Sequence, residues 1–423
     1  MRQSPYPLEH DLGMRCYASD AEGIGGKLRT VAEDFVVEEI PLPAPAGSGP
    51  YLICRLTKKN WEHQHAIKEI AKKMGISHRR IGWAGTKDRR AVTTQYISIY
   101  KVNREAVEHV RLKDITLEPV REQNAPLALG DLTGNRFSLI IRDCTGSSLA
   151  TTVKRTVTDT ATGIPNYYGL QRFGGIRPVT HRVGEYILLG DYKGAVLTYI
   201  GRAYPQEPEE IRKIRQIFYE KRDPALALAA LPIAMGFERA MLQHLYNRPD
   251  DYAGALGELP PKLLSMFVSA FQSYLFNEAL SARLESGLSL TEAAPGDRLI
   301  FANGRKDIVT AATLGTAARL IERERCGIAI FMPGREPYTP SSESECRIAE
   351  ILEERGVGPE NFSKASAFVR TAFDGALRPV ALKTYVTADV EVTNVRLSFT
   401  LPPGHYATTV AREFMKTDPL YMI

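Results

Sequence analysis

The sequence predicts an α+β protein with more than one domain, and three observations support this class. The chain has 423 residues, which is more than one domain usually contains. Residues with high β-propensity gather near both ends of the chain, and apolar residues recur at helical spacing between them. We therefore expect residues 1–166 and 376–423 to form one discontinuous domain and residues 167–375 to form a second, mixed α/β domain.

The first part of the chain contains four predicted strands. Phe35–Ile40, Tyr51–Leu56, Thr93–Tyr100 and Phe137–Ile141 are rich in β-branched and aromatic residues. Two glutamates in the first of these strands indicate that it is at most half buried. In the last strand, alternate residues fall on opposite faces, with the aromatic residue on the apolar face. This spacing predicts a sheet near the N-terminal end of the chain.

A predicted helix with a basic surface lies within this region. Asn60 is a suitable N-cap and Gly75 a suitable C-terminal stop, and the apolar residues between them share one face. The window Arg55–Arg90 holds 11 Lys and Arg against three acidic residues, a charge of +8, whereas the whole chain carries only +5. A local basic field of this kind is typical of a surface that binds a polyanion. A solvated helix face would carry the same charge.

The middle of the chain changes to helical patterns, and strands return after Arg378. Apolar residues recur at helical spacing from Pro261 to Glu285, and a charged helix is predicted from Pro208 to Lys221. The remaining predicted elements are helices at Ser147–Thr160, Ala317–Arg325 and Ser342–Glu354 and strands at Gly327–Met332, Val386–Val390 and Val395–Leu401.

The most informative stretch is Gly85–Gln95, in which one carboxylate stands among cations. Lys87 precedes Asp88, and Arg89 and Arg90 follow it. Nearby cations favour the ionised form of a carboxyl group, so this aspartate is suited to act as a nucleophile or a base. An ordinary turn with a solvated salt bridge would contain the same residues.

Several other classes of protein are not favoured. The composition, 44% hydrophobic and 24% charged, is typical of a soluble globular protein. The longest mainly apolar run, Ala225–Phe237, is too short to span a bilayer, and the first residues do not resemble a signal peptide. Five scattered cysteines predict reduced thiols, as in the cytoplasm. His63, His65 and Cys54 have no further ligand at suitable spacing, so we predict no metal site.

The Gly85–Gln95 stretch resembles the signature of the TruD family of tRNA pseudouridine synthases, which centres on Gly-(Thr/Gln)-Lys-Asp. Other segments resemble motifs of the same family, and together they extend from residue 25 to residue 414. They are residues 25–40 with Glu-Asp-Phe-Val-Val-Glu, residues 134–137 with Gly-Asn-Arg-Phe, residues 166–174 with Asn-Tyr-Tyr-Gly-Leu-Gln-Arg-Phe-Gly, and residues 401–413, which begin Leu-Pro-Pro-Gly-His-Tyr-Ala-Thr.

The resemblance implies roles for individual side chains at one uridine site, with Asp88 as the catalytic nucleophile. The implied substrate-binding residues are a cation that approaches the nucleophile, two aromatics of the pocket, an amide that contacts the nucleotide and an aromatic over the uracil: Arg29, Phe35, Phe137, Asn135 and Tyr406. The predicted RNA-binding residues are basic side chains of the charged window and one from the motif at 166–174: Lys72, Lys73, Arg79, Arg80, Lys87, Arg89, Arg90 and Arg172.

The resemblance also implies the fold and the reaction. It implies a pseudouridine synthase catalytic domain with a mixed, mainly antiparallel sheet and an inserted α/β domain. It implies isomerisation of uridine to pseudouridine in tRNA, at uridine 13 of the D arm, without a cofactor. We expect a cytoplasmic monomer whose partner is tRNA and which has no contact with membrane. The alternatives are an RNA-binding protein without catalysis and another tRNA-modifying enzyme such as a methyltransferase. A methyltransferase would need a Gly-rich nucleoside-binding loop after a strand, and the sequence shows none.

Overall fold

A computed structural model describes residues 2–44, 47–146 and 148–422 of the chain. The chain divides into two compact units, both built from separate segments. We call Ser19–Ala161 together with Lys383–Met422 the sheet unit. We call Met1–Ala18 together with Thr162–Leu382 the helix-rich unit. The chain therefore leaves the sheet unit after Ala161 and returns to it at Lys383. The division into domains at residues 166 and 376 stays a prediction.

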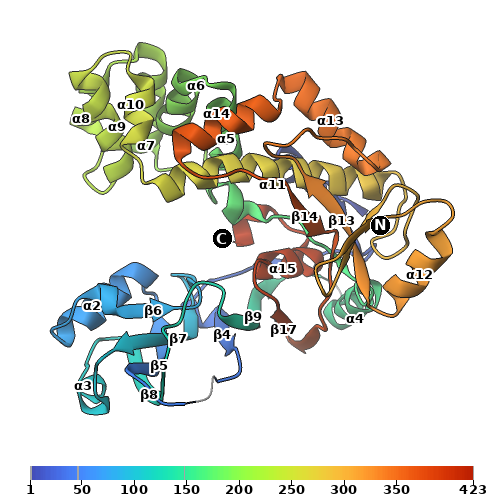
Figure 1. The fold of residues 1–423 in the computed structure, drawn as a ribbon, viewed down its shortest axis with the longest axis horizontal. Coiled ribbons are helices and arrows are strands. Elements are labelled where there is room, and N and C mark those ends of the chain that lie inside the picture. The colour runs from blue at the N-terminus through green and yellow to red at the C-terminus, as the bar shows by residue number, and fades with distance from the viewer. Residues whose placement is uncertain (1, 45–46, 147, 423) are drawn as a thin grey trace. The chain divides into compact units, whose positions relative to one another are not determined.

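The sheet unit is organised around a mixed sheet of nine strands in the described part of the chain (Figure 1). Seven strands lie in the order β16-β17-β9-β4-β7-β5-β8, while β3 pairs with β9 and β6 pairs with β7. The β4–β7 pair is parallel, and every other strand pair described in this sheet is antiparallel, as expected. The strands are β3 (Gly25–Lys27), β4 (Phe35–Pro41), β5 (Tyr51–Lys59), β6 (Ile81–Trp83), β7 (Val92–Tyr100), β8 (Ile115–Gln123), β9 (Leu132–Cys144), β16 (Thr387–Glu391) and β17 (Asn394–Leu401).

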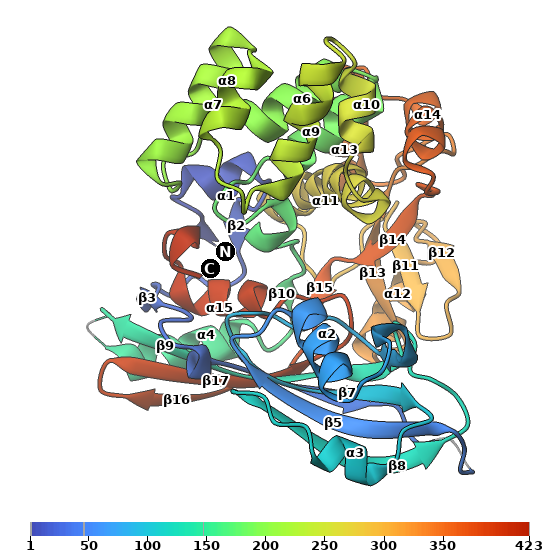
Figure 2. The ribbon, with the colours of Figure 1, turned by 90° about the vertical axis from the view of Figure 1, so that its left-hand side faces the viewer.

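Helix α2 (His63–Lys73) covers one face of β5 and β7 (Figure 2). Its apolar residues, including Ile67 and Ile70, pack against buried side chains of both strands. The helix begins later than predicted. Its N-cap is Glu62, whose carboxylate accepts hydrogen bonds from two backbone N–H groups of the first turn, whereas Asn60 lies in a turn with φ 59°. Gly75 adopts φ 65° just after the helix, which explains why the helix stops there. The other helices of this unit are α3 (Arg104–Glu108), α4 (Leu149–Asp159) and α15 (Ala407–Met415).

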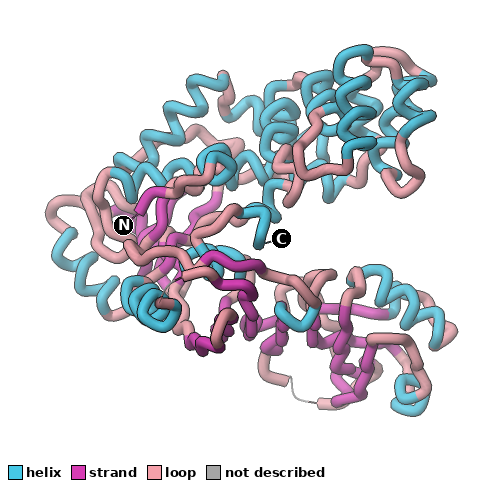
Figure 3. The backbone as a smooth tube through the Cα atoms, turned by 180° about the vertical axis from the view of Figure 1, so that it is seen from behind, coloured by secondary structure: helices cyan, strands magenta, loops and turns pink. Residues whose placement is uncertain are grey.

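The helix-rich unit is built around the long helix α11 (Pro261–Glu285), which has the predicted bounds. Helices α5 and α13 pack against α11, and a small antiparallel sheet has the strand order β12-β11-β13-β14. Figure 3 distinguishes these helices from the strands by colour. The further elements are β1 (Arg2–Gln3), α1 (Pro7–Asp11), β2 (Cys16–Tyr17), β10 (Ile164–Pro165), α5 (Thr180–Leu189), α6 (Tyr192–Val196), α7 (Glu209–Lys221), α8 (Pro224–Ala230), α9 (Gly236–Asn247), α10 (Tyr252–Gly257), β11 (Arg298–Phe301), β12 (Lys306–Ile308), α12 (Leu314–Glu322), β13 (Cys326–Met332), α13 (Glu343–Arg355), α14 (Pro359–Val369), β14 (Ala376–Pro379) and β15 (Ala381–Leu382).

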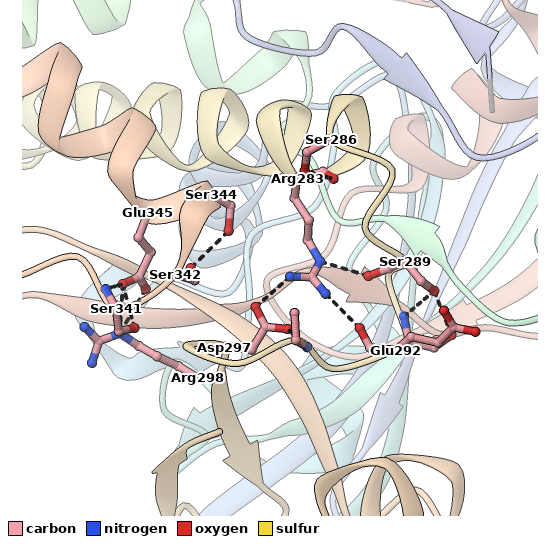
Figure 4. Close-up of polar contacts among 12 residues, drawn as sticks. Arg283, Ser286, Ser289, Glu292, Asp297, Arg298, Ser341, Ser342, Ser344 and Glu345 are labelled. Carbon is pink, nitrogen blue, oxygen red and sulfur yellow. Dashed lines mark hydrogen bonds and ion pairs between the residues drawn. The ribbon is translucent and has the colours of Figure 1, made fainter. Parts of the chain in front are cut away.

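The C-terminal end of α11 is held by a buried arginine (Figure 4). Arg283 is fully buried, and its guanidinium forms a 2.7 Å ion pair with Asp297. It also donates hydrogen bonds to the backbone carbonyls of Ser289 and Glu292. Because all of its hydrogen-bonding partners lie between residues 289 and 297, this arginine fixes the loop that connects α11 to the small sheet. Among the residues described, no helix has the length and apolar character needed to cross a bilayer.

Candidate active site

The loop that carries Asp88 connects β6 to β7 and is fixed at four positions, by side chains from three strands and by Arg29, which lies between β3 and β4. We call residues 84–91 the Asp88 loop. At its start, the side-chain amide of Gln95 on β7 donates a hydrogen bond to the carbonyl of Gly85, at 3.3 Å. Two positions later, the ammonium of Lys87 forms a 2.5 Å ion pair with Glu39 on β4. Both members of this pair are buried. The second carboxylate oxygen of Glu39 accepts a hydrogen bond from the backbone N–H of Tyr96.

The second half of the loop is held by two buried cations. Lys58, on β5, donates to the carbonyl of Asp88 itself at 2.8 Å. Arg29 donates to the carbonyl of Arg90 at 3.1 Å, and Arg90 donates in return to the carbonyl of Arg29 at 3.2 Å. All of these contacts are made by loop backbone or by Lys87 and Arg90, so the carboxylate of Asp88 remains available while the backbone that carries it is restrained.

The Asp88 carboxylate is half-exposed and faces one buried guanidinium. Its Oδ1 lies 3.4 Å from an Nη2 of Arg29, and the exposed fractions of the two side chains are 36% and 4%. The guanidinium of Arg29 also stacks on the ring of Phe35, with Cζ 3.6 Å from the ring centroid. Burial lowers the pKa of Arg29, and the negative charge of Asp88 opposes this shift. This contact orients the carboxylate of Asp88 without covering it.

Aromatic side chains line the same face of the sheet beside this pair. The rings of Phe35 and Phe137 meet edge to face with centroids 6.3 Å apart, and Phe399 stacks on Phe137 at 5.5 Å. All three rings are buried. The strand register explains the contact, because Val37 and Phe399 are the partners of Phe137 on the two strands that flank β9. The result is an apolar wall built from β4, β9 and β17.

Asn135 lies on β9 two residues before Phe137, where it pairs with Glu39 on β4 and Leu401 on β17. Its Oδ1 is buried and has no hydrogen-bond partner among the described residues. The preceding residue must be glycine, because a Cβ on Gly134 would lie 2.6 Å from the carbonyl oxygen of Leu401. The close approach of the two strands therefore fixes the backbone that presents this amide. A buried acceptor without a partner carries a cost that a donor on a ligand would remove.

Tyr406 is the N-cap residue of α15 and follows Leu401 by five residues. Its side chain is half-buried, and its carbonyl accepts a hydrogen bond from the N–H of Thr409 in the first turn of the helix. The structure thus brings Arg29 into contact with both Asp88 and Phe35, and it brings Phe137 into contact with Phe35. The strand register places Asn135, and the start of α15 places Tyr406.

Comparison with known proteins identifies the family of this arrangement. The model of the family "tRNA pseudouridine synthase D (TruD)" matches residues 11–414. The chain belongs to the TruD family. A relative from Methanococcoides burtonii named as a tRNA pseudouridine synthase D is 38% identical over 433 residues, and the match covers 98% of each chain. One from Archaeoglobus fulgidus with the same name is 36% identical, covering 97% of this chain and 100% of the relative.

A solved structure of a TruD protein from Methanosarcina mazei matches the fold with a TM-score of 0.85 and 36% sequence identity. The match covers 99% of this chain and 100% of that chain. The predicted family and the predicted α+β fold with a mixed sheet are therefore confirmed. Membership of the TruD family also confirms the predicted enzyme class, a tRNA pseudouridine synthase.

The basic residues predicted to contact RNA fall into two groups. Five are exposed: Lys72, Lys73, Arg79, Arg89 and Arg90. The other three are already engaged within their own unit. Lys87 is buried against Glu39, and Arg80 donates to the backbone carbonyls of residues 100 and 101. Arg172 lies in the helix-rich unit, where it donates to the hydroxyl of Ser273 at 3.1 Å. An RNA role for these eight residues stays a prediction.

Two polar residues of this TruD site were not found from the sequence. Glu39 looked like part of a half-exposed strand, yet it lies on the buried face because its partner Lys87 enters from the Asp88 loop. Lys58 looked like part of the solvated basic window. The alternation of Leu52, Cys54 and Leu56 places Lys58 on the same apolar face, a signal that could have identified it. Among the described residues, no group of three or more His, Cys, Asp and Glu side chains could hold a metal ion.

Proposed function

We propose that this protein isomerises uridine 13 in the D arm of tRNA to pseudouridine, with Asp88 as the nucleophile and without a cofactor. One observation carries the assignment to Asp88. Its carboxylate is half-exposed and faces a buried guanidinium 3.4 Å away, while the backbone around it is held at four positions. A restrained carboxylate that a substrate can reach is what covalent catalysis requires.

The reaction rearranges the atoms of one nucleotide. The carboxylate of Asp88 attacks either C1′ of the ribose or C6 of the uracil, and the bond between C1′ and N1 breaks. The base rotates, C5 forms a carbon–carbon bond to C1′, and the bond to Asp88 breaks, which releases the carboxylate. The proton on C5 is lost while N1 gains one. Substrate and product contain the same atoms in the same oxidation state overall. The balance therefore needs no electron donor, electron acceptor or transferred group.

The other side chains have complementary roles in this proposal. A uridine within folded tRNA must leave its stack to reach the carboxylate, and the apolar wall of Phe35, Phe137 and Phe399 suits the flipped base. The unpartnered Oδ1 of Asn135 accepts a hydrogen bond from an N–H group of the uracil. Tyr406 stacks on the exposed face of the base. Arg29 orients the carboxylate of Asp88, and its guanidinium lies over the ring of Phe35.

The test is to measure pseudouridine in unmodified tRNA after incubation with the protein in the presence of a metal chelator. We expect pseudouridine at position 13 and none in a transcript with cytidine there. Asp88→Asn should bind tRNA but lose several orders of magnitude in rate, because no other group can replace a covalent nucleophile. Asp143→Asn is a matched control, because Asp143 is also an exposed aspartate near a cation, with its carboxylate 3.6 Å from Lys27.

The outcomes separate the alternatives. Pseudouridine formation by Asp88→Asn at the wild-type rate would remove Asp88 from the mechanism. Wild-type protein that binds tRNA tightly but forms no pseudouridine would instead be a non-catalytic RNA-binding protein. Pseudouridine at a different position would keep the chemistry and reject position 13.

A further inference from the structure

Lys58 is a fully buried lysine beside the candidate nucleophile. It follows the alternating apolar residues of β5 onto the covered face of the sheet, and its exposed fraction is 0%. Lysine is almost never fully buried unless its ammonium group is paired, because desolvating the charge is costly. Here the ammonium donates to two backbone carbonyls, those of Trp61 and Asp88, each at 2.8 Å. One lysine thus ties the end of β5 to the peptide of Asp88.

The charges around Lys58 show why this contact is maintained at neutral pH. Burial lowers the pKa of Lys58 to about 8, and the positive charge of Lys87 acts in the same direction. The negative charges of Asp88 and Glu62 oppose the shift. Near pH 7 the ammonium is therefore mainly protonated. Its hydrogen bonds to the two carbonyls are charge-assisted, which makes them about twice as strong as neutral ones.

We propose that Lys58 is a positioning residue for the isomerisation, which fixes the peptide of Asp88 so that the carboxylate points at the flipped nucleotide. This inference rests on the proposed function of Asp88 as the nucleophile. The geometry favours positioning because the ammonium contacts the carbonyl of that residue and the neighbouring carbonyl of Trp61. Of the four side chains that restrain the Asp88 loop, Lys58 alone contacts the peptide of Asp88 directly.

The experiment compares Lys58→Met and Lys58→Gln with wild-type protein in single-turnover assays at saturating protein concentration, well below the melting temperature of each variant. Met has nearly the same length but no donor, whereas Gln keeps an uncharged donor. We expect Lys58→Met to lose about tenfold to a hundredfold in rate, the cost of a misplaced reacting group. Lys58→Gln should lose less, and the Kd for tRNA should change by less than about twofold in both variants.

The matched control is Lys416→Met. Lys416 is also a buried lysine of the sheet unit, and its ammonium donates to the carbonyl of Ala21 at 2.7 Å. The control therefore loses stability through the same chemistry, at a residue outside the candidate site. It should melt earlier and keep the wild-type rate at low temperature. A Lys58→Met protein that turns over tRNA at the wild-type rate, or whose whole defect is in Kd, overturns the inference.

A pH profile adds a readout that a purely structural role would not change, and it needs only Lys58→Gln if the Met variant does not fold. The titratable and charged groups that face this ammonium are Asp88, Glu62, Lys87 and His63. The pKa of His63 is about 4 because of its burial, and hydrogen bonds from the backbone help to lower that of Glu62, so neither titrates between pH 7 and 9. We expect the wild-type rate to fall as the pH rises through 8 and the Lys58→Gln rate to stay level. Identical profiles overturn the inference.

Failure of this inference and failure of the proposed function look different. If Asp88→Asn is inactive while both Lys58 variants keep the wild-type rate, Asp88 remains the nucleophile and the positioning role is rejected. If Asp88→Asn itself is active, both proposals are overturned, whatever the Lys58 variants do.

Discussion

Breaking the ion pair between Glu39 and Lys87 should destabilise the sheet unit more than any surface change. Both side chains are buried, with exposed fractions of 6% and 8%, and their charged atoms are 2.5 Å apart. Removing one partner of such a pair leaves the other charge desolvated, which typically costs about 3–5 kcal/mol. Glu39→Gln and Lys87→Met should each lower the free energy of unfolding by this amount. The double variant should lose much less than the sum, because it leaves no unpaired charge.

The assay is chemical denaturation followed by tryptophan fluorescence. The two tryptophans of the chain, Trp61 and Trp83, both belong to the sheet unit, so their fluorescence reports the unfolding of that unit. The coupling energy is the difference between the double variant and the sum of the single variants. We expect it to be several kcal/mol. Additive losses, within the roughly 0.5 kcal/mol found for independent sites, would refute the reasoning. The single variants should also react more slowly, because the Asp88 loop loses one of its four restraints.

Three further predictions test the remaining site residues. Removing the exposed basic side chains should reduce the slope of log K for tRNA binding against log salt concentration by roughly 0.7–0.9 for each lost phosphate contact. Arg80→Ala removes the donor to two backbone carbonyls and should mainly lower the melting temperature. The variants to combine are Lys72→Ala, Lys73→Ala and Arg79→Ala, and an unchanged slope would mean that this surface is merely solvated. Tyr406→Phe should keep most activity. Tyr406→Ala should lose about 1–3 kcal/mol of stacking energy, which would appear as a tenfold or greater fall in rate. If Tyr406→Ala melts early but turns over tRNA normally at low temperature, the stacking role is wrong. Burial lowers the pKa of His63 to about 4. Between pH 6.5 and 4 the unfolded chain therefore binds a proton that the folded protein does not. The free energy of unfolding should fall by roughly 3 kcal/mol as the pH drops through that range. The same denaturation assay at both ends of the range checks this, and an equal loss in His63→Gln would assign it to other groups.

The sequence predicted the elements that carry the site better than it predicted their contacts. Residues of high β-propensity identified the strands of Phe35 and Phe137, and helical spacing identified α11 with its bounds. Both signals are local and need no knowledge of the fold. The pairing of Phe35 with Phe137 depends on strand register, which joins segments about a hundred residues apart in the chain. For that contact the sequence offered only the resemblance to the TruD family.

The polar contacts were missed for a related reason. Lys58 and Asp88 are 30 residues apart, and Glu39 and Lys87 are 48 residues apart. In the sequence each of these side chains lies in a charged segment, where a solvated residue is the usual outcome. Only the fold reveals which of these residues contact one another. The short helices α8 and α9 were also missed. They lie on either side of Pro232, which interrupts the apolar run Ala225–Phe237.

The order of the strands has a consequence for folding during synthesis on the ribosome. Strand β17 pairs with β9 along most of its length, yet some 250 residues of other structure are synthesised between the two. Until Lys383–Met422 leaves the exit tunnel, the nascent chain exposes β9 as an unpaired edge, the kind of edge that recruits other chains. Contacts this distant in sequence also form slowly. Phe399, which completes the apolar wall, and Tyr406, which is expected to cover the base, are therefore added last. A truncated translation product should be inactive and prone to aggregation.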